Sequence, residues 1–256
     1  MTYSIAMAGK GGTGKTTICG LFLDHLVQSG KGPILAVDAD ANSNLNEVLG
    51  VKRPVSLGEI REEIAKAELE EQNPIPPGMS KQEYMDFRFG SALVEENNYD
   101  MLVMGRTQGK GCYCYVNDVL RGQLHKYYQN YQYLIVDNEA GLEHISRGIL
   151  PPVDLILLVS DCSRRGIQAA GRIAEMIGEL GLKARKTGLI VNRAPDGQLN
   201  EGTKEEIALQ RLTLFGVIPQ DPLVYEYDSA GTPLIKLPMD SPVRQSLGKI
   251  IQSLKL

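Results

Sequence analysis

The 256-residue sequence lacks an apolar run long enough to cross a membrane, and it shows no signal-peptide pattern. A spanning helix needs about 20 mostly apolar residues, whereas Lys10 and Lys15 already interrupt the first apolar segment. The sequence also lacks an excess of basic residues, because 27 Lys and Arg stand against 31 Asp and Glu, for a net charge of −4. The electrostatic footprint of a nucleic-acid-binding protein is therefore absent. We expect a cytoplasmic protein that binds neither membrane nor nucleic acid.

Cysteine is scarce as well, with four in the chain, and without a secretory context disulfides are not expected. The C-terminal segment 241–256 is amphipathic but lacks the basic face and bulky aromatics of a membrane anchor, so we expect a helix packed against the body. The remaining composition, 43% hydrophobic and 23% charged, is ordinary for a globular protein. We predict a single domain over residues 1–256.

A glycine-rich segment near the N-terminus carries the most specific motif. Residues 9–16 read GKGGTGKT and fit the phosphate-loop pattern G-x-x-x-x-G-K-[ST], between an apolar run at 3–7 and an amphipathic segment at 17–28. In a strand–loop–helix unit of this kind, backbone N–H groups converge on phosphate oxygens at the helix N-terminus. The nucleotide-contacting residues predicted here are Gly9, Gly11, Gly12, Thr13, Gly14, Lys15, Thr16 and Thr17. A glycine-rich turn that matches by chance is the alternative.

Two lysines and a threonine of this loop have separate predicted roles. Lys15 would reach the β- and γ-phosphates, and the Thr16 hydroxyl would complete a Mg²⁺ shell. Lys10 is an unusual addition, and with it the loop resembles the deviant Walker A motif of the MinD/ParA/nitrogenase-iron-protein group of dimeric ATPases. The resemblance implies that Lys10 reaches the partner subunit's nucleotide and neutralises transition-state charge, as an arginine finger does, so that hydrolysis requires a dimer. A solvated loop lysine is the alternative.

Two carboxylates follow a second buried strand, which we predict over residues 33–38. Asp38 and Asp40 stand where parallel-sheet enzymes keep their chemistry, at the carboxyl edge of the strands. In the group that the chain resembles this segment is switch I, which implies that Asp40 orients the attacking water and Asp38 supports the Mg²⁺ shell. The alternative is a pair of residues that cap the next helix.

Residues 51–90 differ from their surroundings because they are rich in charge and carry apolar residues at helical spacing before a proline-rich turn. We predict a helical insertion on the nucleotide face, which would be either a lid or a docking surface for a client protein. A third strand is predicted to follow at residues 100–105.

Cys112 and Cys114 come after this third strand, at a spacing too tight for an easy disulfide. Two thiolates one residue apart can bind a soft metal side by side, but a Zn²⁺-like ion needs four tetrahedral ligands and nothing nearby in the sequence supplies the other two. A symmetric dimer would supply them, because a twofold axis beside the segment brings two such pairs together. On the local pattern alone, two incidental cysteines near a helix start are the alternative.

The deviant Walker A loop, the CYC segment and the stretch DNEAGLEH at residues 137–144 together resemble the nickel-maturation ATPases of carbon monoxide dehydrogenase and acetyl-CoA synthase, the CooC/AcsF type. The likeness covers essentially the whole chain. It implies that Cys112 and Cys114 of each subunit bind Ni²⁺ or Zn²⁺ at the dimer interface, and that ATP drives delivery of nickel to the client's metal cluster. Four thiolates alone would not discriminate the two ions. Cys19 and Cys162, by contrast, are expected to be small core residues.

The strand predicted over residues 133–137 ends in an acid, as a Walker B strand does. Asp137 would hold Mg²⁺ through a water, and the resemblance implies that Gly141 contacts the γ-phosphate in switch II. Glu139 stands where many relatives carry proline. His144 is expected to be a structural histidine, with a transient metal ligand or a switch hydrogen-bond donor as the alternative.

The predicted elements that remain are strands over residues 154–160, 187–191 and 215–218 and a helix over 163–180 with Ser163 as its cap. In the group that the chain resembles, an asparagine after the sixth strand reads the adenine edge. This implies base recognition by Asn192, with an ordinary turn residue as the alternative. Pro219, Gln220 and Asp221 are expected to wrap the far side of the base through backbone contacts.

Together these elements predict a doubly wound, mostly parallel α/β sheet of seven or eight strands with helices on both faces, the architecture of a P-loop NTPase. The predicted function is a homodimeric Mg-ATPase that uses ATP/ADP, shares a Ni²⁺ or Zn²⁺ site and serves carbon monoxide dehydrogenase or acetyl-CoA synthase. The alternative is a nucleotide-dependent positioning or scaffold ATPase, as in the MinD and ParA branches, with incidental cysteines. It predicts ATP-dependent attachment to membrane or DNA, for which the sequence offers no support.

Overall fold

The computed structural model of the chain describes residues 2–40, 44–69, 74–105, 122, 124–138, 152–182 and 184–256. Within these residues one sheet of eight strands runs through the molecule in the order β3-β4-β2-β5-β1-β6-β7-β8. Its strands are β1 Tyr3–Ala8, β2 Ile34–Ala39, β3 Val94–Glu96, β4 Tyr99–Val103, β5 Tyr133–Asn138, β6 Leu155–Asp161, β7 Lys186–Ala194 and β8 Leu214–Pro219. All neighbouring pairs are parallel except β3 with β4. The predicted fold class is confirmed.

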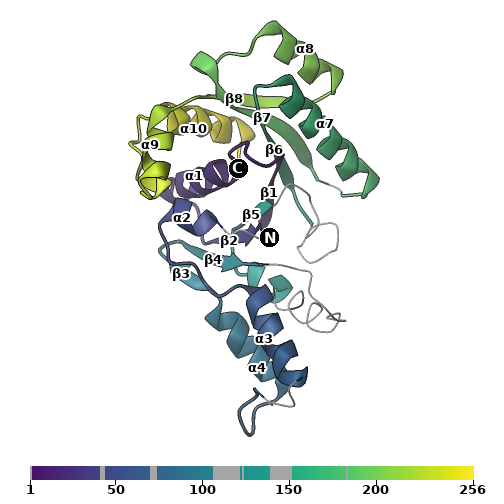
Figure 1. The fold of residues 1–256 in the computed structure, drawn as a ribbon, viewed down its shortest axis with the longest axis vertical. Helices are drawn as coiled ribbons and strands as arrows, with labels where there is room; N and C mark the ends of the chain where they lie inside the picture. The colour runs from purple at the N-terminus through teal and green to yellow at the C-terminus, as the bar shows by residue number, and fades with distance from the viewer. Residues whose placement is uncertain are drawn as a thin grey trace.

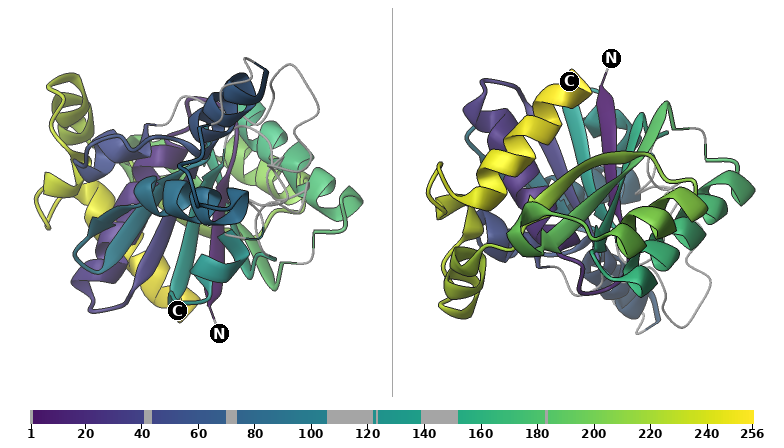
Figure 2. Two further views of the ribbon diagram at one scale, coloured as in Figure 1. Left: turned by 90° about the horizontal axis from the view of Figure 1, so that it is seen from below. Right: turned by 90° about the horizontal axis from the view of Figure 1, so that it is seen from above.

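Burial explains why the central strands read as continuous apolar runs. Nearly every residue of β1, β2, β5 and β6 is buried, because helices cover both faces of a parallel sheet. The helices are α1 Lys15–Gln28, α2 Leu45–Leu49, α3 Leu57–Leu69, α4 Lys81–Ser91, α7 Arg164–Glu179, α8 Glu201–Leu209, α9 Pro222–Ser229 and α10 Pro242–Leu254, with short 3-10 turns η1 Pro195–Gly197 and η2 Leu234–Lys236. Helices α1 and α10 lie on one side of the sheet, and α7 and α8 on the other (Figures 1 and 2).

Two helices, α3 and α4, occupy much of the segment predicted to be a helical insertion. Ile60 of α3 and Phe89 of α4 belong to the same buried cluster as Leu102 of β4, so both helices cover one face of the sheet. Their far ends extend well away from the sheet (Figure 1). Helices α3 and α4 therefore contribute to the core at one end and extend away from the sheet at the other.

The C-terminal helix packs against the body as predicted. Leu247 and Ile251 of α10 are buried with Phe22 of α1, and a buried ion pair joins the two helices, with 2.6 Å between Arg244 Nη1 and Asp24 Oδ2. In the described part of the chain, no helix has the length and apolar character to span a bilayer.

Some elements were not predicted. Strand β3 lies antiparallel to β4, and a tight turn with Asn98 at a φ of 69° joins them. Helices α2, α8 and α9 are short or weakly amphipathic, so the periodicity of the sequence does not reveal them.

Candidate functional site

The glycine-rich segment forms the loop between β1 and α1 at the carboxyl edge of the sheet. A Cβ on Gly9 would lie 2.1 Å from the carbonyl oxygen of Val159 on β6, and a Cβ on Gly14 would lie 2.4 Å from Asn192 Nδ2. Gly14 is also the N-cap of α1, with a φ of 89°. The loop therefore lies so close to β6 and β7 that only glycine fits at these two positions.

The two loop lysines lie in different surroundings. Lys15 is buried, and its Nζ donates to the carbonyl oxygen of Lys10 at 3.3 Å, where the Thr13 hydroxyl also donates at 2.9 Å. The Lys10 side chain is exposed. This arrangement fits Lys15 to a phosphate within its own subunit and leaves Lys10 accessible to a second molecule. The role of Lys10 across a dimer stays a prediction.

Strands β2 and β5 bring two acids together at this edge. Asp38 and Asp137 are paired in register between β2 and β5. Asp137 is 1% exposed, and among the described residues neither of its carboxylate oxygens accepts a hydrogen bond of ordinary geometry. Burial raises the pKa of Asp137 to about 7, and the nearby Thr16 hydroxyl and Lys15 partly offset this shift.

A buried carboxylate with a threonine hydroxyl nearby fits a hard divalent cation. Mg²⁺ prefers oxygen ligands and usually keeps several waters, and a buried polar atom without a partner calls for an explanation such as an ion. Asp137 and Thr16 thus fit a Mg²⁺ shell, and their role as its ligands stays a prediction.

Asp38 is fully buried and holds the turn that follows β2. Its Oδ1 accepts from the Asp40 N–H and its Oδ2 accepts from the Leu45 N–H, both at 3.0 Å. Burial raises the pKa of Asp38 to about 6, although both backbone hydrogen bonds lower it. The Asp38 carboxylate thus accepts from the first residue of α2, a helix whose N-cap is Asn44. Support of a Mg²⁺ shell by Asp38 and water positioning by Asp40, which is half-buried, stay predictions.

Two residues of β7 contact the phosphate loop. The buried Asn192 donates from Nδ2 to the carbonyl oxygen of Thr13 at 2.9 Å. Its neighbour Arg193, with a φ of 56°, donates from Nη1 to the carbonyl oxygen of Gly12 at 3.1 Å. Asn192 thus lies beside the phosphate loop, and its predicted contact with the base stays a prediction. Sequence reasoning missed Arg193, and its adjacency to Asn192 is the signal that could have indicated it.

The segment after β8 lies beside the end of β7. Pro219 pairs with Ala194 in register, and the Gln220 N–H donates to the Ala194 carbonyl at 3.0 Å. The Asp221 carboxylate is buried and accepts from the N–H groups of Leu223 and Val243 at 3.1 and 3.4 Å. This side chain therefore fixes the start of α9 and of α10, and the predicted backbone contacts with a base are not tested.

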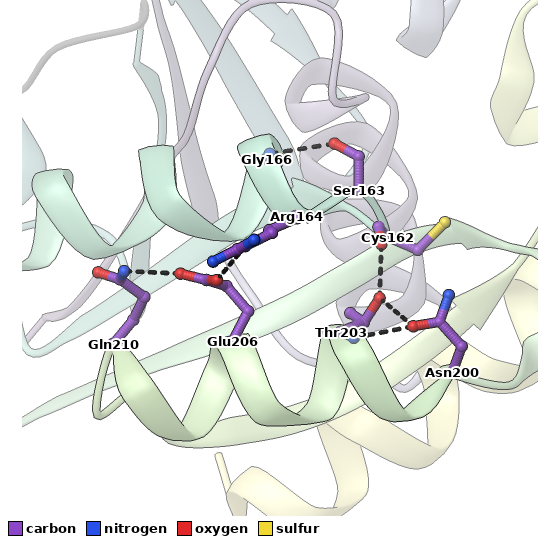
Figure 3. Close-up of polar contacts among 8 residues, drawn as sticks. All are labelled: Cys162, Ser163, Arg164, Gly166, Asn200, Thr203, Glu206 and Gln210. Atoms are coloured by element: carbon purple, nitrogen blue, oxygen red, sulfur yellow. Dashed lines mark hydrogen bonds and ion pairs between the residues drawn. The ribbon is translucent and has the colours of Figure 1, made fainter.

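A polar network joins α8 to the end of β6 and the start of α7 (Figure 3). The Thr203 hydroxyl donates to the Cys162 carbonyl at 2.8 Å, and Arg164 Nε donates to the nearly buried Glu206 at 2.7 Å. Ser163 caps α7 as predicted, since its hydroxyl accepts from the Gly166 N–H at 3.0 Å. Hydrogen bonds from Gln210 and Arg164 lower the pKa of Glu206, so this acid belongs to a structural pair.

The two cysteines that the structure describes, Cys19 and Cys162, lie in or against the core. Cys19 is fully buried in the core, where burial raises the pKa of its thiol well above the usual range. Cys162 is partly buried against the core. No group of three or more metal-binding side chains occurs within the described ranges. The core prediction for Cys19 is confirmed, and Cys162 packs at the edge of the core.

Several predicted site residues lie outside the described residues, namely Cys112, Cys114, Glu139, Gly141 and His144. The structure does describe the approach to the cysteine segment. The Met104 N–H donates to the Asp38 carbonyl oxygen at 2.8 Å, and the Met104 carbonyl accepts from the Gly58 N–H at 2.9 Å. Gly105 has a φ of 67° and packs against Ser56. The chain therefore enters the cysteine segment at the sheet edge that carries the phosphate loop.

A groove of about 740 Å³ opens beside the start of α1. Thr16 and Thr17 line it from α1, Asn46 from α2, and Thr232 and Pro233 from the segment before η2. The predicted nucleotide contact Thr17 thus faces open space next to the phosphate loop.

Comparison with known proteins agrees with this geometry. The family model described as the CobQ/CobB/MinD/ParA nucleotide binding domain matches residues 4–234. An uncharacterised ATP-binding protein of Methanocaldococcus jannaschii is 38% identical, over 98% of this chain and 97% of that protein. The carbon monoxide dehydrogenase accessory protein CooC of Rhodospirillum rubrum is 29% identical, over 89% of this chain and 87% of its own length.

A solved structure shows the same fold. The MinC:MinD cell division protein complex of Aquifex aeolicus contains a chain that superposes with a TM-score of 0.71 at 22% identity, over 99% of this chain and 96% of that one.

Proposed function

Because the chain belongs to the CobQ/CobB/MinD/ParA family of nucleotide-binding domains and is an ATPase of that family, we propose that it is a nickel-delivery ATPase. Two copies bind one Ni²⁺, or Zn²⁺, through Cys112 and Cys114 of each subunit. ATP binding and hydrolysis drive insertion of nickel into the metal cluster of carbon monoxide dehydrogenase or acetyl-CoA synthase. That the chain is a nucleotide-binding P-loop ATPase does not depend on this proposal.

The observation that carries the proposal is the position of the Cys-x-Cys pair in the chain. The pair follows β4 closely, and β4 ends at the edge of the sheet that holds the phosphate loop and both aspartates. Soft thiolates suit Ni²⁺ and Zn²⁺, and a pair from each of two subunits completes a four-ligand site. The likeness to the CooC accessory protein, which covers most of both chains, supports the same conclusion.

Hydrolysis rests on residues that the structure describes. Backbone N–H groups of the loop and the Lys15 ammonium bind the phosphates, and Asp40 holds the attacking water in line with the γ-phosphate. Lys10 of the second subunit adds positive charge where negative charge develops on the transferred group. When bound at Thr16 and Asp137, Mg²⁺ neutralises phosphate charge and orients the phosphate chain.

Asp38 offers a physical connection between the nucleotide and the metal segment. Its side chain holds the Asp40 N–H, and its main-chain carbonyl holds the Met104 N–H at 2.8 Å. If the turn after β2 shifts when the γ-phosphate is lost, Asp38 therefore passes the shift to Met104, the residue that follows β4. Cys112 and Cys114 lie eight and ten residues beyond Met104, so the nucleotide state changes the geometry of the shared site.

Metal stoichiometry tests the proposal. The purified chain, loaded with Ni²⁺ and freed of excess ion, is expected to retain about one Ni²⁺ per two chains by elemental analysis. Cys112→Ala and Cys114→Ala should each lose the ion and still bind ADP. Cys162→Ala is the matched control, because this cysteine is partly exposed and lies far along the chain from the pair; it should retain the metal.

The alternative is a positioning ATPase of the MinD or ParA kind, which the likeness to MinD proteins favours. It predicts that all three cysteine variants hold as much nickel as the original chain. It also predicts ATP-dependent sedimentation with lipid vesicles or DNA, which the nickel proposal does not.

A further inference from the structure

We infer that Arg193 is a positioning residue for the phosphate loop: its guanidinium holds the Gly12 carbonyl away from the anion site, so that the N–H groups of the loop face the phosphates. The inference depends on nucleotide binding by this family and not on the nickel proposal. It rests on three observations, which concern the loop carbonyls, the backbone of Arg193 and the support behind it.

The first observation is that three carbonyl groups of the loop are all held from the protein side. The Lys10 carbonyl accepts from the Thr13 hydroxyl and from Lys15 Nζ, at 2.9 and 3.3 Å. The next two acceptors are contacted from β7, since the Gly12 carbonyl accepts from Arg193 Nη1 at 3.1 Å and the Thr13 carbonyl from Asn192 Nδ2 at 2.9 Å.

The orientation of these peptides decides whether the loop binds an anion. A carbonyl that pointed at a phosphate would repel it, whereas an N–H group attracts it. The peptides next to Gly12 and Gly14 can rotate easily because glycine has no Cβ, and both residues adopt positive φ values, of 80° and 89°. A donor that holds the Gly12 carbonyl therefore removes a conformation in which the loop would bind phosphate poorly.

The second observation concerns the backbone of Arg193. It has a φ of 56°, a left-handed conformation that is unfavourable for a non-glycine residue. This conformation directs the chain so that the guanidinium lies beside the loop, where Nη2 would be 3.8 Å from a Cβ on Gly14. Glycine would relieve the strain at this position but could not contact the loop.

The third observation is that the turn carrying Arg193 is fixed from behind. The Cys162 thiol contacts the Arg193 carbonyl oxygen at 3.9 Å, and the Cys162 carbonyl is held by the Thr203 hydroxyl at 2.8 Å. Helix α8 therefore supports the turn that positions the guanidinium, as Figure 3 shows for Thr203 and Cys162. Because Arg193 itself is exposed, the core does not depend on its side chain.

A matched pair of substitutions tests this role. Arg193→Gly removes the guanidinium and relieves the left-handed strain. Arg211→Gly is the control, because Arg211 is also exposed and left-handed, with a φ of 52°, and its side chain has no hydrogen bond or ion pair among the described residues. Calorimetric titration of each purified chain with Mg-ADP gives the dissociation constant, and thermal unfolding without nucleotide gives the stability.

The expected result is that Arg193→Gly weakens Mg-ADP binding on the order of tenfold, while Arg211→Gly stays within about twofold of the original chain. Neither variant should unfold at a lower temperature. Arg193→Lys keeps the charge without the fixed planar donor and should also bind Mg-ADP more weakly than the original chain.

Three results would overturn the inference. Equal affinities for Arg193→Gly and Arg211→Gly would mean that the guanidinium does not act on the loop. Full affinity in Arg193→Lys would mean that charge alone suffices. A lower unfolding temperature for Arg193→Gly than for Arg211→Gly would make the role structural.

Discussion

Asp38 and Asp137 are paired in register on adjacent parallel strands, β2 and β5, and both are almost completely buried. Burial raises the pKa of Asp38 to about 6 and that of Asp137 to about 7, and the negative charge of Asp38 raises the pKa of Asp137 further. Burial therefore makes ionisation of both acids unfavourable in the metal-free protein.

This relationship predicts how stability depends on pH. Because the folded pKa values exceed the usual value of 3.8, the folded state binds more protons than the unfolded state between about pH 4 and pH 7. The contribution of the pair to the free energy of unfolding is therefore full below about pH 4 and is lost as the pH rises through 6 and 7. Asp137→Asn should raise the melting temperature of the metal-free protein at pH 8 by a few degrees and should reduce the loss between pH 4 and pH 7.

Thermal unfolding of both proteins across this pH range, in a chelator, measures the effect. A variant that melts at or below the original temperature at pH 8 would show that Asp137 is not destabilised by burial. Asp137→Asn should also lose Mg²⁺-dependent ATP hydrolysis.

The exposed lysine of the phosphate loop gives a second prediction. Lys10→Ala should bind Mg-ADP with nearly unchanged affinity, because the side chain is exposed and only its backbone carbonyl takes part in the contacts within the loop. Its ATP hydrolysis should fall by about 10³-fold, the size of effect expected for a charge supplied in trans. Phosphate release at saturating ATP measures it, with Lys15→Ala as the control that loses binding as well. Unchanged turnover in Lys10→Ala would remove the role assigned to this residue.

The glycines of the loop give a third prediction, on stability. In Gly9→Ala the new methyl group would lie 2.1 Å from the Val159 carbonyl oxygen, so the loop or β6 must move. We expect a loss of about 2 kcal/mol in the free energy of unfolding. Gly11→Ala is the control, because a Cβ there meets nothing within 4 Å and the backbone needs no positive φ. Denaturant unfolding that gave equal stabilities for the two variants would contradict the close approach of the loop to β6.

The buried ion pair between α1 and α10 gives a fourth prediction. Arg244→Ala leaves Asp24 buried without its partner, and removing one partner of such a pair costs about 3 kcal/mol. Asp24→Asn combined with Arg244→Met should recover part of that loss. Lys204→Ala, which removes an exposed pair with Glu201, should cost less than about 0.5 kcal/mol. Similar losses for Arg244→Ala and Lys204→Ala would mean that the pair does not hold α10.

The sequence was sufficient to predict the sheet and much of its edge. Apolar runs and the phosphate-loop pattern indicated β1, β2, β5 and β6, because strands buried on both faces and a glycine-rich anion loop leave strong local signals. The same signals indicated that Lys15, Thr16 and Asp137 lie together.

Other features depend on tertiary contacts that leave no periodic signal. The use of the Asp38 carboxylate to hold Asp40 and Leu45 follows from how the turn folds back on β2. The contact of Arg193 with Gly12 joins residues 181 positions apart in the chain. The core role of α3 and α4 was missed because a charge-rich segment resembles a surface insertion until its few buried residues meet β4.

The central claim is that two copies of the chain share one metal ion and that nucleotide controls this assembly. Native mass spectrometry of the purified chain with Mg-ATP and nickel tests it most directly. The account predicts a mass of two chains, two nucleotides and one nickel ion, and the loss of only the nickel in Cys112→Ala. A single chain with ATP bound, at every nickel concentration, would contradict it.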